Sequence, residues 1–161
     1  MVNVLPALGK DAKELLEIQK KCFKKYSDIY GDFDSNPYHM TLHRMEFNLR
    51  YKYGAYYKIV DFVTEKIVGG IFIFELDDPS VMKIAQFYLD ESYQHIGIGS
   101  MVLQNVLKKH SDVKLWYVDT ILQEDYNVNF YKHLGFEEID FEEEHEGLTF
   151  ITLLKKIEDK K

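Results

Sequence analysis

Hydrophobic positions in the first fifty residues follow helical spacing after one short apolar run. Residues 2–5 predict a strand, and residues 31–37, which carry Gly, Asp, Ser, Asn and Pro, predict a loop. A second helical stretch begins at Thr41. The long loop and this second helix form either a lid or substrate wall, or, together with the first helix, an ordinary pair covering a sheet. The first helix is predicted by an apolar stripe separated by Lys, Glu and Gln: Ala12, Leu15, Leu16, Cys22 and Phe23.

The middle of the chain changes to strand periodicity. Residues 54–63 and 67–76 are rich in β-branched and aromatic side chains, and their three-residue connection predicts an antiparallel hairpin. Residues 77–79 break the pattern. The remaining elements are expected as a strand at 82–89, a helix from Ile98, a strand at 113–118, a helix at 127–134 and a strand pair at 136–141 and 148–154. The strand–helix–strand unit favours a parallel pairing, which gives a mixed α/β sheet with helices on both faces.

Composition and charge narrow the class of protein. Of 161 residues, 46% are hydrophobic and 15% aromatic, which excludes a disordered chain. The net charge of −7 disfavours nucleic acid as a partner. The longest uncharged apolar run, residues 68–74, is far below the ~18 residues of a membrane span, and no secretory signal is visible. Because Cys22 is the single cysteine, we expect a reducing, cytoplasmic location. The short apolar runs predict no membrane partner.

Two runs of like charge have simpler interpretations than binding sites. The basic run at residues 20–25 lies within the first amphipathic pattern and predicts a solvated helix face. The acidic run at residues 142–146 ends at Gly147 and predicts an exposed turn between the last two strands. Net charge therefore leaves the substrate open.

A glycine-containing turn lies between the strand at 82–89 and the following helix. Glycine permits backbone conformations with positive φ and a close approach to a ligand. The unpaired amides of a first helical turn favour an anion, and pyrophosphate is the natural occupant. The dinucleotide fingerprint requires a third glycine where this chain has Val102, and no glycine-rich loop ending in Gly-Lys-Ser or Gly-Lys-Thr is present.

The stretch from Phe87 to Gly99 resembles the acetyl-CoA signature of the GNAT family of N-acetyltransferases. In that signature Gln or Arg is followed by two residues, Gly, one residue, and Gly or Ala, as in Gln94-His95-Ile96-Gly97-Ile98-Gly99. A second block, a strand at 116–120 and a helix ending in Phe-Tyr-Lys-His-Leu-Gly-Phe at 130–136, follows in the family's order. The resemblance covers about residues 83–136. It implies a single N-acetyltransferase domain over residues 1–161.

The fold implied by the resemblance is a mixed, mostly antiparallel central sheet of about six to seven strands, with helices on both faces and a splayed central strand pair. Acetyl-CoA is the implied co-substrate, without a metal. Tyr131 aligns with the usual general acid, which protonates the departing thiolate. The implied cofactor-binding positions are Phe87, Leu89, Gln94, His95, Ile96, Gly97, Ile98, Gly99, Ser100 and Asn127.

The chain also departs from the family pattern. His95 stands where glycine is usual, and Glu124 replaces an asparagine of some members. Residues 83–86 contain no carboxylate, although several members carry a glutamate base on this strand. The general base is therefore either another side chain or water. Asp119 is a candidate base or substrate anchor, and it could equally bond local backbone.

The leading functional hypothesis is acetyl transfer to a primary amine of a small molecule or peptide. A non-catalytic module of the same fold, which binds CoA or regulates, is the alternative. A Rossmann-type oxidoreductase is disfavoured by Val102 and by the antiparallel hairpins before the glycine turn. The acceptor and the range of acyl groups stay open, and exposed strands at the carboxyl end favour a homodimer.

Overall fold

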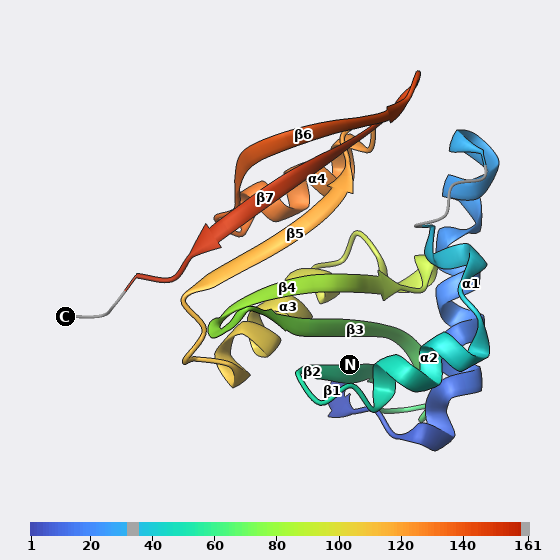
Figure 1. The fold of residues 1–161 in the computed structure, drawn as a ribbon. Coiled ribbons are helices and arrows are strands. Elements are labelled where there is room, and N and C mark those ends of the chain that lie inside the picture. The colour runs from blue at the N-terminus through green and yellow to red at the C-terminus, as the bar shows by residue number, and fades with distance from the viewer. Residues whose placement is uncertain (32–35, 159–161) are drawn as a thin grey trace.

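The computed structural model describes residues 1–31 and 36–158 (Figure 1). The residues 32–35 of the expected loop lie outside this range. The helices are α1 (Ala12–Tyr30), α2 (Leu42–Leu49), α3 (Ile98–Lys109) and α4 (Asp125–His133), with short 3-10 turns at Gly9–Asp11, Pro37–His39 and Glu91–Tyr93. The strands are β1 (Val2–Pro6), β2 (Gly54–Asp61), β3 (Ile67–Leu76), β4 (Asp78–Leu89), β5 (Leu115–Ile121), β6 (Glu137–His145) and β7 (Leu148–Lys156).

The seven strands form one sheet in the order β1-β2-β3-β4-β5-β7-β6. β4 and β5 pair in parallel, and every other neighbouring pair is antiparallel. The parallel pair follows from α3, which carries the chain from the end of β4 back to the start of β5. The predicted fold class, a mixed and mostly antiparallel sheet, is confirmed.

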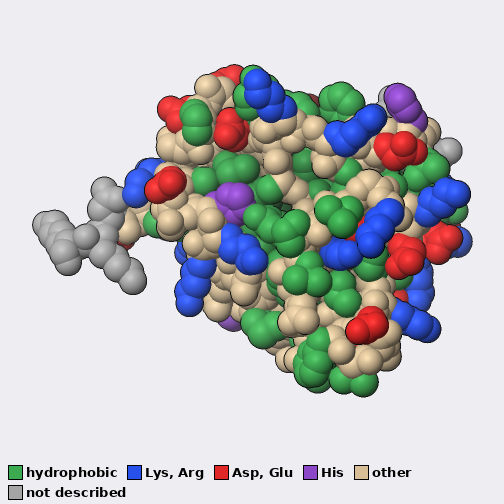
Figure 2. All heavy atoms as spheres, turned by 90° about the horizontal axis from the view of Figure 1, so that it is seen from below, with side chains coloured by type: hydrophobic (Ala, Val, Ile, Leu, Met, Phe, Trp, Pro, Cys, Tyr) green, Lys and Arg blue, Asp and Glu red, His purple; other side chains and the backbone are tan. Residues whose placement is uncertain are grey.

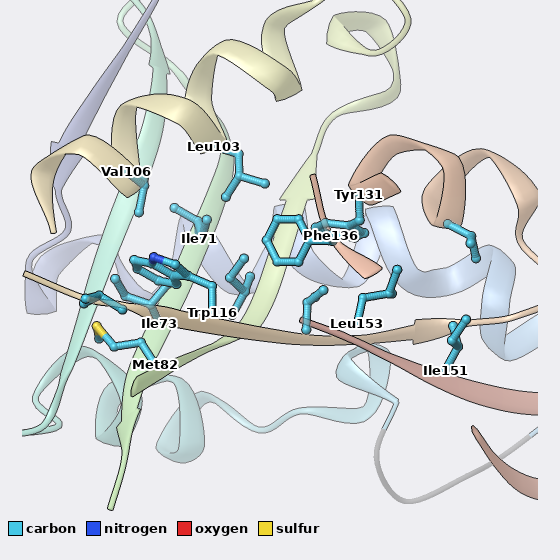
Figure 3. Packing of buried hydrophobic residues seen from close by; sticks show 14 residues of the cluster. Ile71, Ile73, Met82, Leu103, Val106, Trp116, Tyr131, Phe136, Ile151 and Leu153 are labelled. Atoms are coloured by element: carbon cyan, nitrogen blue, oxygen red, sulfur yellow. The ribbon is translucent and has the colours of Figure 1, made fainter. Parts of the chain in front are cut away.

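Helices cover both faces of the sheet. α1 and α2 bury Leu15 and Met45 against Tyr56, Phe72 and Tyr88. On the other face, α3 and α4 pack over a cluster that includes the fully buried Trp116. Figure 3 shows Leu103 and Val106 of α3 directed at the sheet. In the described parts of the chain, no helix is long and apolar enough to cross a membrane.

Some predicted boundaries were wrong. β5 covers Leu115–Ile121 rather than residues 113–118. β4 begins at Asp78, because Asp77 alone makes the reversal in a left-handed conformation (φ 54°). Residues 142–145 of the acidic run belong to β6 rather than to a turn, and only Glu146 lies in the reversal with Gly147, whose φ is 90°. On the face seen from below, Lys and Arg are interspersed with acidic and hydrophobic side chains, without a continuous basic surface (Figure 2).

The central strands β4 and β5 diverge, as the resemblance predicted. Their parallel pairing runs only from Val81 with Leu115 to Ile84 with Val118, and both strands continue beyond it. The divergence begins at a β-bulge, since Phe72 of β3 pairs with Gln86 while Ile73 pairs with Ile84, which leaves Ala85 as the extra residue. A bulge bends its strand and increases the local twist, so the end of β4 turns away from β5 (Figure 1).

Candidate active site

A cleft of about 570 Å³ opens where β4 and β5 separate. One wall comes from α1 and the residues after it, and the opposite wall comes from the glycine turn and α4. Strands β6 and β7 close the side next to β5. Among the residues that line it are Tyr26, Gln86, Phe87, Gln94, His95, Gly97, Gly99, Ser100, Asp119, Asn127, Tyr131, Asp140, Glu142 and Thr152.

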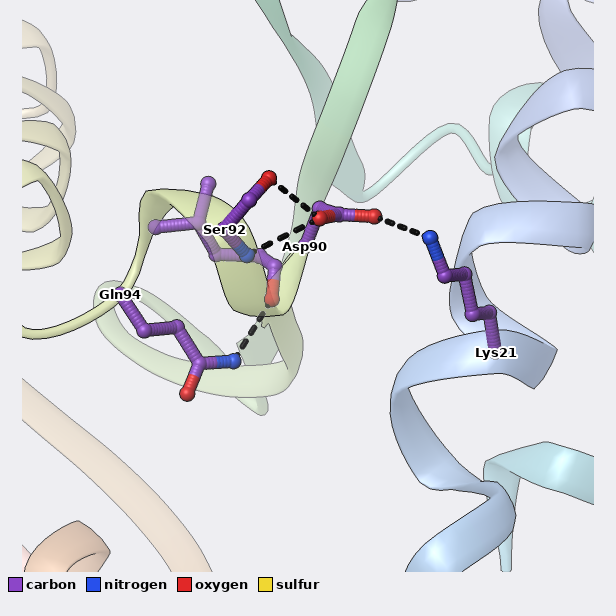
Figure 4. A network of polar contacts seen from close by, with 5 residues as sticks. Lys21, Asp90, Ser92 and Gln94 are labelled. Carbon is purple, nitrogen blue, oxygen red and sulfur yellow. Dashed lines mark hydrogen bonds and ion pairs between the residues drawn. The ribbon is translucent and has the colours of Figure 1, made fainter.

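The glycine turn is held in place by polar contacts at its start (Figure 4). The Asp90 carboxylate accepts hydrogen bonds from the backbone and hydroxyl of Ser92, at 3.0 and 2.7 Å. Its other oxygen pairs with the Lys21 ammonium of α1 at 2.7 Å, and this hydrogen bond is the main reason that the pKa of Asp90 lies below its ordinary value. The turn is thus tied to α1 before the glycines begin.

Gln94 shapes the turn with both of its amide groups. Its side-chain Nε2 donates to the Leu89 carbonyl at 2.7 Å, and its backbone N–H donates to the Glu91 carbonyl at 3.1 Å. The backbone N–H and one of the two side-chain N–H groups are therefore engaged within the turn. The structure gives Gln94 a part in building the loop, and its expected contact with the cofactor stays a prediction.

The residues after Gln94 present an anion-binding geometry. Gly97 caps α3 with φ 84° and ψ 0°, a left-handed conformation that glycine adopts without strain. The first hydrogen bond of the helix is donated by Met101 to the Gly97 carbonyl, so the amides of Ile98, Gly99 and Ser100 precede it. Such amides point outward from the helix start and favour a negative charge.

His95 stands in the glycine turn at a position where glycine is usual in the family. Its φ is 63°, so a non-glycine residue takes a left-handed conformation in the turn. Its ring lies 4.4 Å, centroid to centroid, from the ring of Tyr126 on α4. Ile96 is exposed beside it. The pair of rings bridges the glycine turn and α4, and sequence reasoning missed Tyr126 because no local pattern marks it.

Backbone groups of β4 face the opening. The Asp90 N–H donates to Val68 of β3, and alternation along the strand turns the backbone groups of Leu89 and Phe87 to the other side, toward β5. The Leu89 carbonyl accepts the hydrogen bond from Gln94 Nε2. The side chains of Phe87 and Leu89 instead face α3 and α4, where the ring centroids of Phe87 and Phe130 lie 6.0 Å apart.

Tyr131 and Asn127 lie one helical turn apart on α4, and both line the cleft. Tyr131 is 8% exposed, and its ring packs against Phe130 and Phe136. Burial in this apolar surrounding raises the pKa of Tyr131, and the nearby Tyr26 adds to the rise. The phenol is therefore fully protonated near neutral pH.

Two tyrosines of α1 contact α4, and no local sequence pattern predicts either contact. Asn127 Nδ2 donates a hydrogen bond to the Tyr26 hydroxyl at 3.0 Å. The hydroxyl of Tyr30 donates to the Glu124 carboxylate. Burial is the main cause that raises the pKa of Tyr30, and this hydrogen bond is the second cause. α1 therefore forms a wall of the cleft, together with Asn36 and Pro37 after it.

Other candidate groups have structural partners. Both oxygens of Asp119 are engaged, one by Lys83 Nζ and one by Thr152 Oγ1, each at 2.6 Å. Cys22 is half-buried, and burial raises the pKa of its thiol to about 11. A thiol that stays protonated at neutral pH is a poor nucleophile. Across residues 1–31 and 36–158, no group of His, Cys, Asp and Glu is placed to hold a metal ion.

A model of the acetyltransferase (GNAT) family matches residues 13–136. The chain belongs to the GNAT family of acetyltransferases. No curated protein matches it. As a member of this acetyltransferase family, it is an enzyme of the class expected from the glycine turn and the second block, and the family's acyl donor is acetyl-CoA.

Solved structures show the same fold at low sequence identity. A GNAT-family acetyltransferase from Staphylococcus aureus Mu50 has 20% identity and a TM-score of 0.77, with 98% of this chain and 100% of that chain covered. The ribosomal-protein-S18-alanine N-acetyltransferase from Escherichia coli has 12% identity and a TM-score of 0.79, with 100% and 97% covered. PaiA N-acetyltransferase from Thermoplasma acidophilum, in complex with coenzyme A, has 17% identity and a TM-score of 0.74, with 98% and 99% covered.

Proposed function

We propose that this GNAT acetyltransferase transfers the acetyl group of acetyl-CoA to a primary amine of a small molecule or peptide, in one catalytic domain spanning residues 1–161. The observation that carries the proposal is the convergence of two features on one cleft. The left-handed turn at Gly97 and the α4 face that bears Asn127 and Tyr131 meet where β4 leaves β5. Neither feature alone would indicate acyl transfer.

The residues present fit acetyl-CoA. The amides of Ile98, Gly99 and Ser100 would hold the pyrophosphate, with His95 and Ile96 at the edge of the turn. The open backbone edge of β4 at Phe87 would bond the pantetheine arm as an added strand would, and Leu89, whose carbonyl already accepts from Gln94, would lie at the end of that edge. Asn127 would bond the same arm from α4. Acetyl-CoA itself supplies an acetyl group activated as a thioester.

Tyr131 would donate a proton to the departing sulfur. Its raised pKa keeps the phenol protonated at neutral pH, as a general acid must be before the reaction. Because Lys83 and Thr152 donate to the two oxygens of Asp119, we assign Asp119 the role of a substrate anchor rather than that of the general base. The amine would then lose its proton to another side chain or to water.

The test separates an enzyme from a non-catalytic CoA-binding module. Thermal stabilisation by acetyl-CoA is expected from both, whereas release of free thiol with a panel of amines is expected only from the enzyme. Acetyl-CoA binding without thiol release for any amine would favour the module.

The cytoplasmic location and the homodimer expected from the sequence stay predictions.

The Tyr131→Phe variant tests the proton donor. It should lower turnover about 10²-fold, at the lower end of the general-acid range, because the CoA thiol is a fair leaving group without help. The affinity for acetyl-CoA should stay nearly unchanged, since only a hydroxyl is lost. Equal turnover of variant and parent, at saturating acetyl-CoA with chemistry rate-limiting, would reduce Tyr131 to a packing residue.

A further inference from the structure

Tyr26 brings a second phenol into the cleft from the opposite side. It lies on α1, which covers the other face of the sheet from α4. Its hydroxyl nevertheless reaches Asn127, whose Nδ2 donates to it at 3.0 Å. Tyr26, Asn127 and Tyr131 all line the same cleft. Two phenols and one amide therefore gather where β4 and β5 diverge.

We propose that Tyr26 is a second proton donor to the departing CoA sulfur, acting beside Tyr131. The inference rests on the proposed acetyl transfer. As the amine nitrogen bonds the acetyl carbon, the carbon–sulfur bond breaks and its electron pair stays on sulfur. The Tyr26 O–H proton passes to that sulfur and leaves a phenolate. The acylated nitrogen loses its extra proton to solvent, and the phenolate takes one back from solvent.

The contacts of the Tyr26 hydroxyl favour this step. The Asn127 N–H already donates to the oxygen that becomes charged, and a hydrogen bond to a charged acceptor is about twice as strong as a neutral one. The Lys25 ammonium lies 5.1 Å from the centre of the ring. Among the described residues the Tyr26 O–H has no acceptor, so its proton is free to point into the cleft.

The other two tyrosines near this site are placed differently. The Tyr131 oxygen has no hydrogen-bond partner within residues 1–31 and 36–158, and burial beside Phe130 and Phe136 disfavours its phenolate. The Tyr30 hydroxyl already donates its proton to the Glu124 carboxylate. Of the three tyrosine hydroxyls, only that of Tyr26 accepts a hydrogen bond while its own proton is available for donation.

The experiment compares Tyr26→Phe, Tyr131→Phe and the double variant, with Tyr30→Phe as the matched control one turn along α1. At saturating acetyl-CoA the second donor shows in the Tyr131→Phe background, where Tyr131 no longer supplies the one proton that the sulfur takes. Adding Tyr26→Phe to Tyr131→Phe should lower kcat at least about a further tenfold, with the dissociation constant of acetyl-CoA little changed. Adding Tyr30→Phe to Tyr131→Phe should change kcat little. A Tyr26→Phe/Tyr131→Phe variant equal to Tyr131→Phe, or an effect of Tyr26→Phe confined to KM in that background, would overturn the inference.

A fluorinated tyrosine at position 26 tests proton donation directly. Fluorination lowers the phenol pKa while keeping the ring and the hydroxyl. If Tyr26 must be protonated, the alkaline limb of the kcat–pH profile in the Tyr131→Phe background should move to lower pH by the drop in phenol pKa. A fixed alkaline limb would leave Tyr26 as a structural residue. An absence of thiol release by the parent enzyme with every amine would instead overturn the proposed function itself.

Discussion

Replacing Gly97 with glutamate tests where the enzyme binds the anionic part of acetyl-CoA. Gly97 is left-handed, and no heavy atom lies within 4 Å of the place where a Cβ would stand. The variant should therefore fold, at a cost of about 1–2 kcal/mol for a left-handed non-glycine residue. Its new carboxylate would lie at the start of α3, where we expect the pyrophosphate.

The loss of affinity has two sources. The new carboxylate would occupy the helix start, whose attraction for an anion is worth about 0.3–2 kcal/mol. It would also repel the pyrophosphate, and two unit charges about 4 Å apart repel by about 4 kcal/mol at an effective dielectric constant of about 20. Solvent at the mouth of the cleft screens part of this repulsion. A net loss of about 3–4 kcal/mol corresponds to affinity lower by about 10²–10³-fold.

Calorimetric titration with acetyl-CoA measures the loss, and Gly147→Glu is the matched control. Gly147 has φ 90° and no heavy atom within 4 Å of a Cβ, yet it lies in the β6–β7 turn and does not line the cleft. The control should lose similar stability and keep its affinity for acetyl-CoA. If Gly97→Glu also kept its affinity within about threefold, the pyrophosphate would bind elsewhere and the reasoning from the helix start would fail.

Three further predictions concern stability and reactivity. Gly69→Ala should lower the free energy of unfolding by about 1–3 kcal/mol, because a Cβ there would lie 2.4 Å from the Tyr88 carbonyl oxygen; an unchanged melting temperature would contradict this packing. The hydrogen bond from Lys21 lowers the pKa of Asp90, so the carboxylate stabilises the fold above its unfolded pKa, and this stabilisation is lost as pH falls through the folded pKa. Asp90→Asn should therefore make the melting temperature less dependent on pH in acid. Cys22, with a pKa of about 11, should react with iodoacetamide slowly at neutral pH and faster toward that value; rapid neutral labelling would refute its burial.

Periodicity predicted most of the fold because most elements bury one face. It failed where no face is buried. Every residue of β6 is exposed, so hydrophobic alternation is missing and its acidic end was interpreted as a turn. The start of β4 is also exposed, so no hydrophobic alternation marks Asp78 and Pro79 as strand residues. The bulge at Ala85 depends on the pairing with β3, and no local pattern encodes that register.

The candidate site was predictable where backbone conformation dictates the residue type. A left-handed cap requires glycine, so Gly97 could be located from its spacing. Tyr26 could not be, since its partner Asn127 is 101 positions away and the contact arises only when α1 and α4 meet. The engagement of Gln94 within the turn likewise depends on how the chain folds back after Leu89.

β6 is an edge strand of the sheet, and its sequence governs which surfaces can associate. An unpaired edge invites another chain to extend the sheet, and like charges along it oppose that addition. Six of its nine residues are acidic: Glu137, Glu138, Asp140, Glu142, Glu143 and Glu144. Two copies aligned edge to edge would bring these carboxylates together. The acidic edge of β6 therefore disfavours extension of the sheet by a second copy, and the homodimer expected from the sequence stays a prediction.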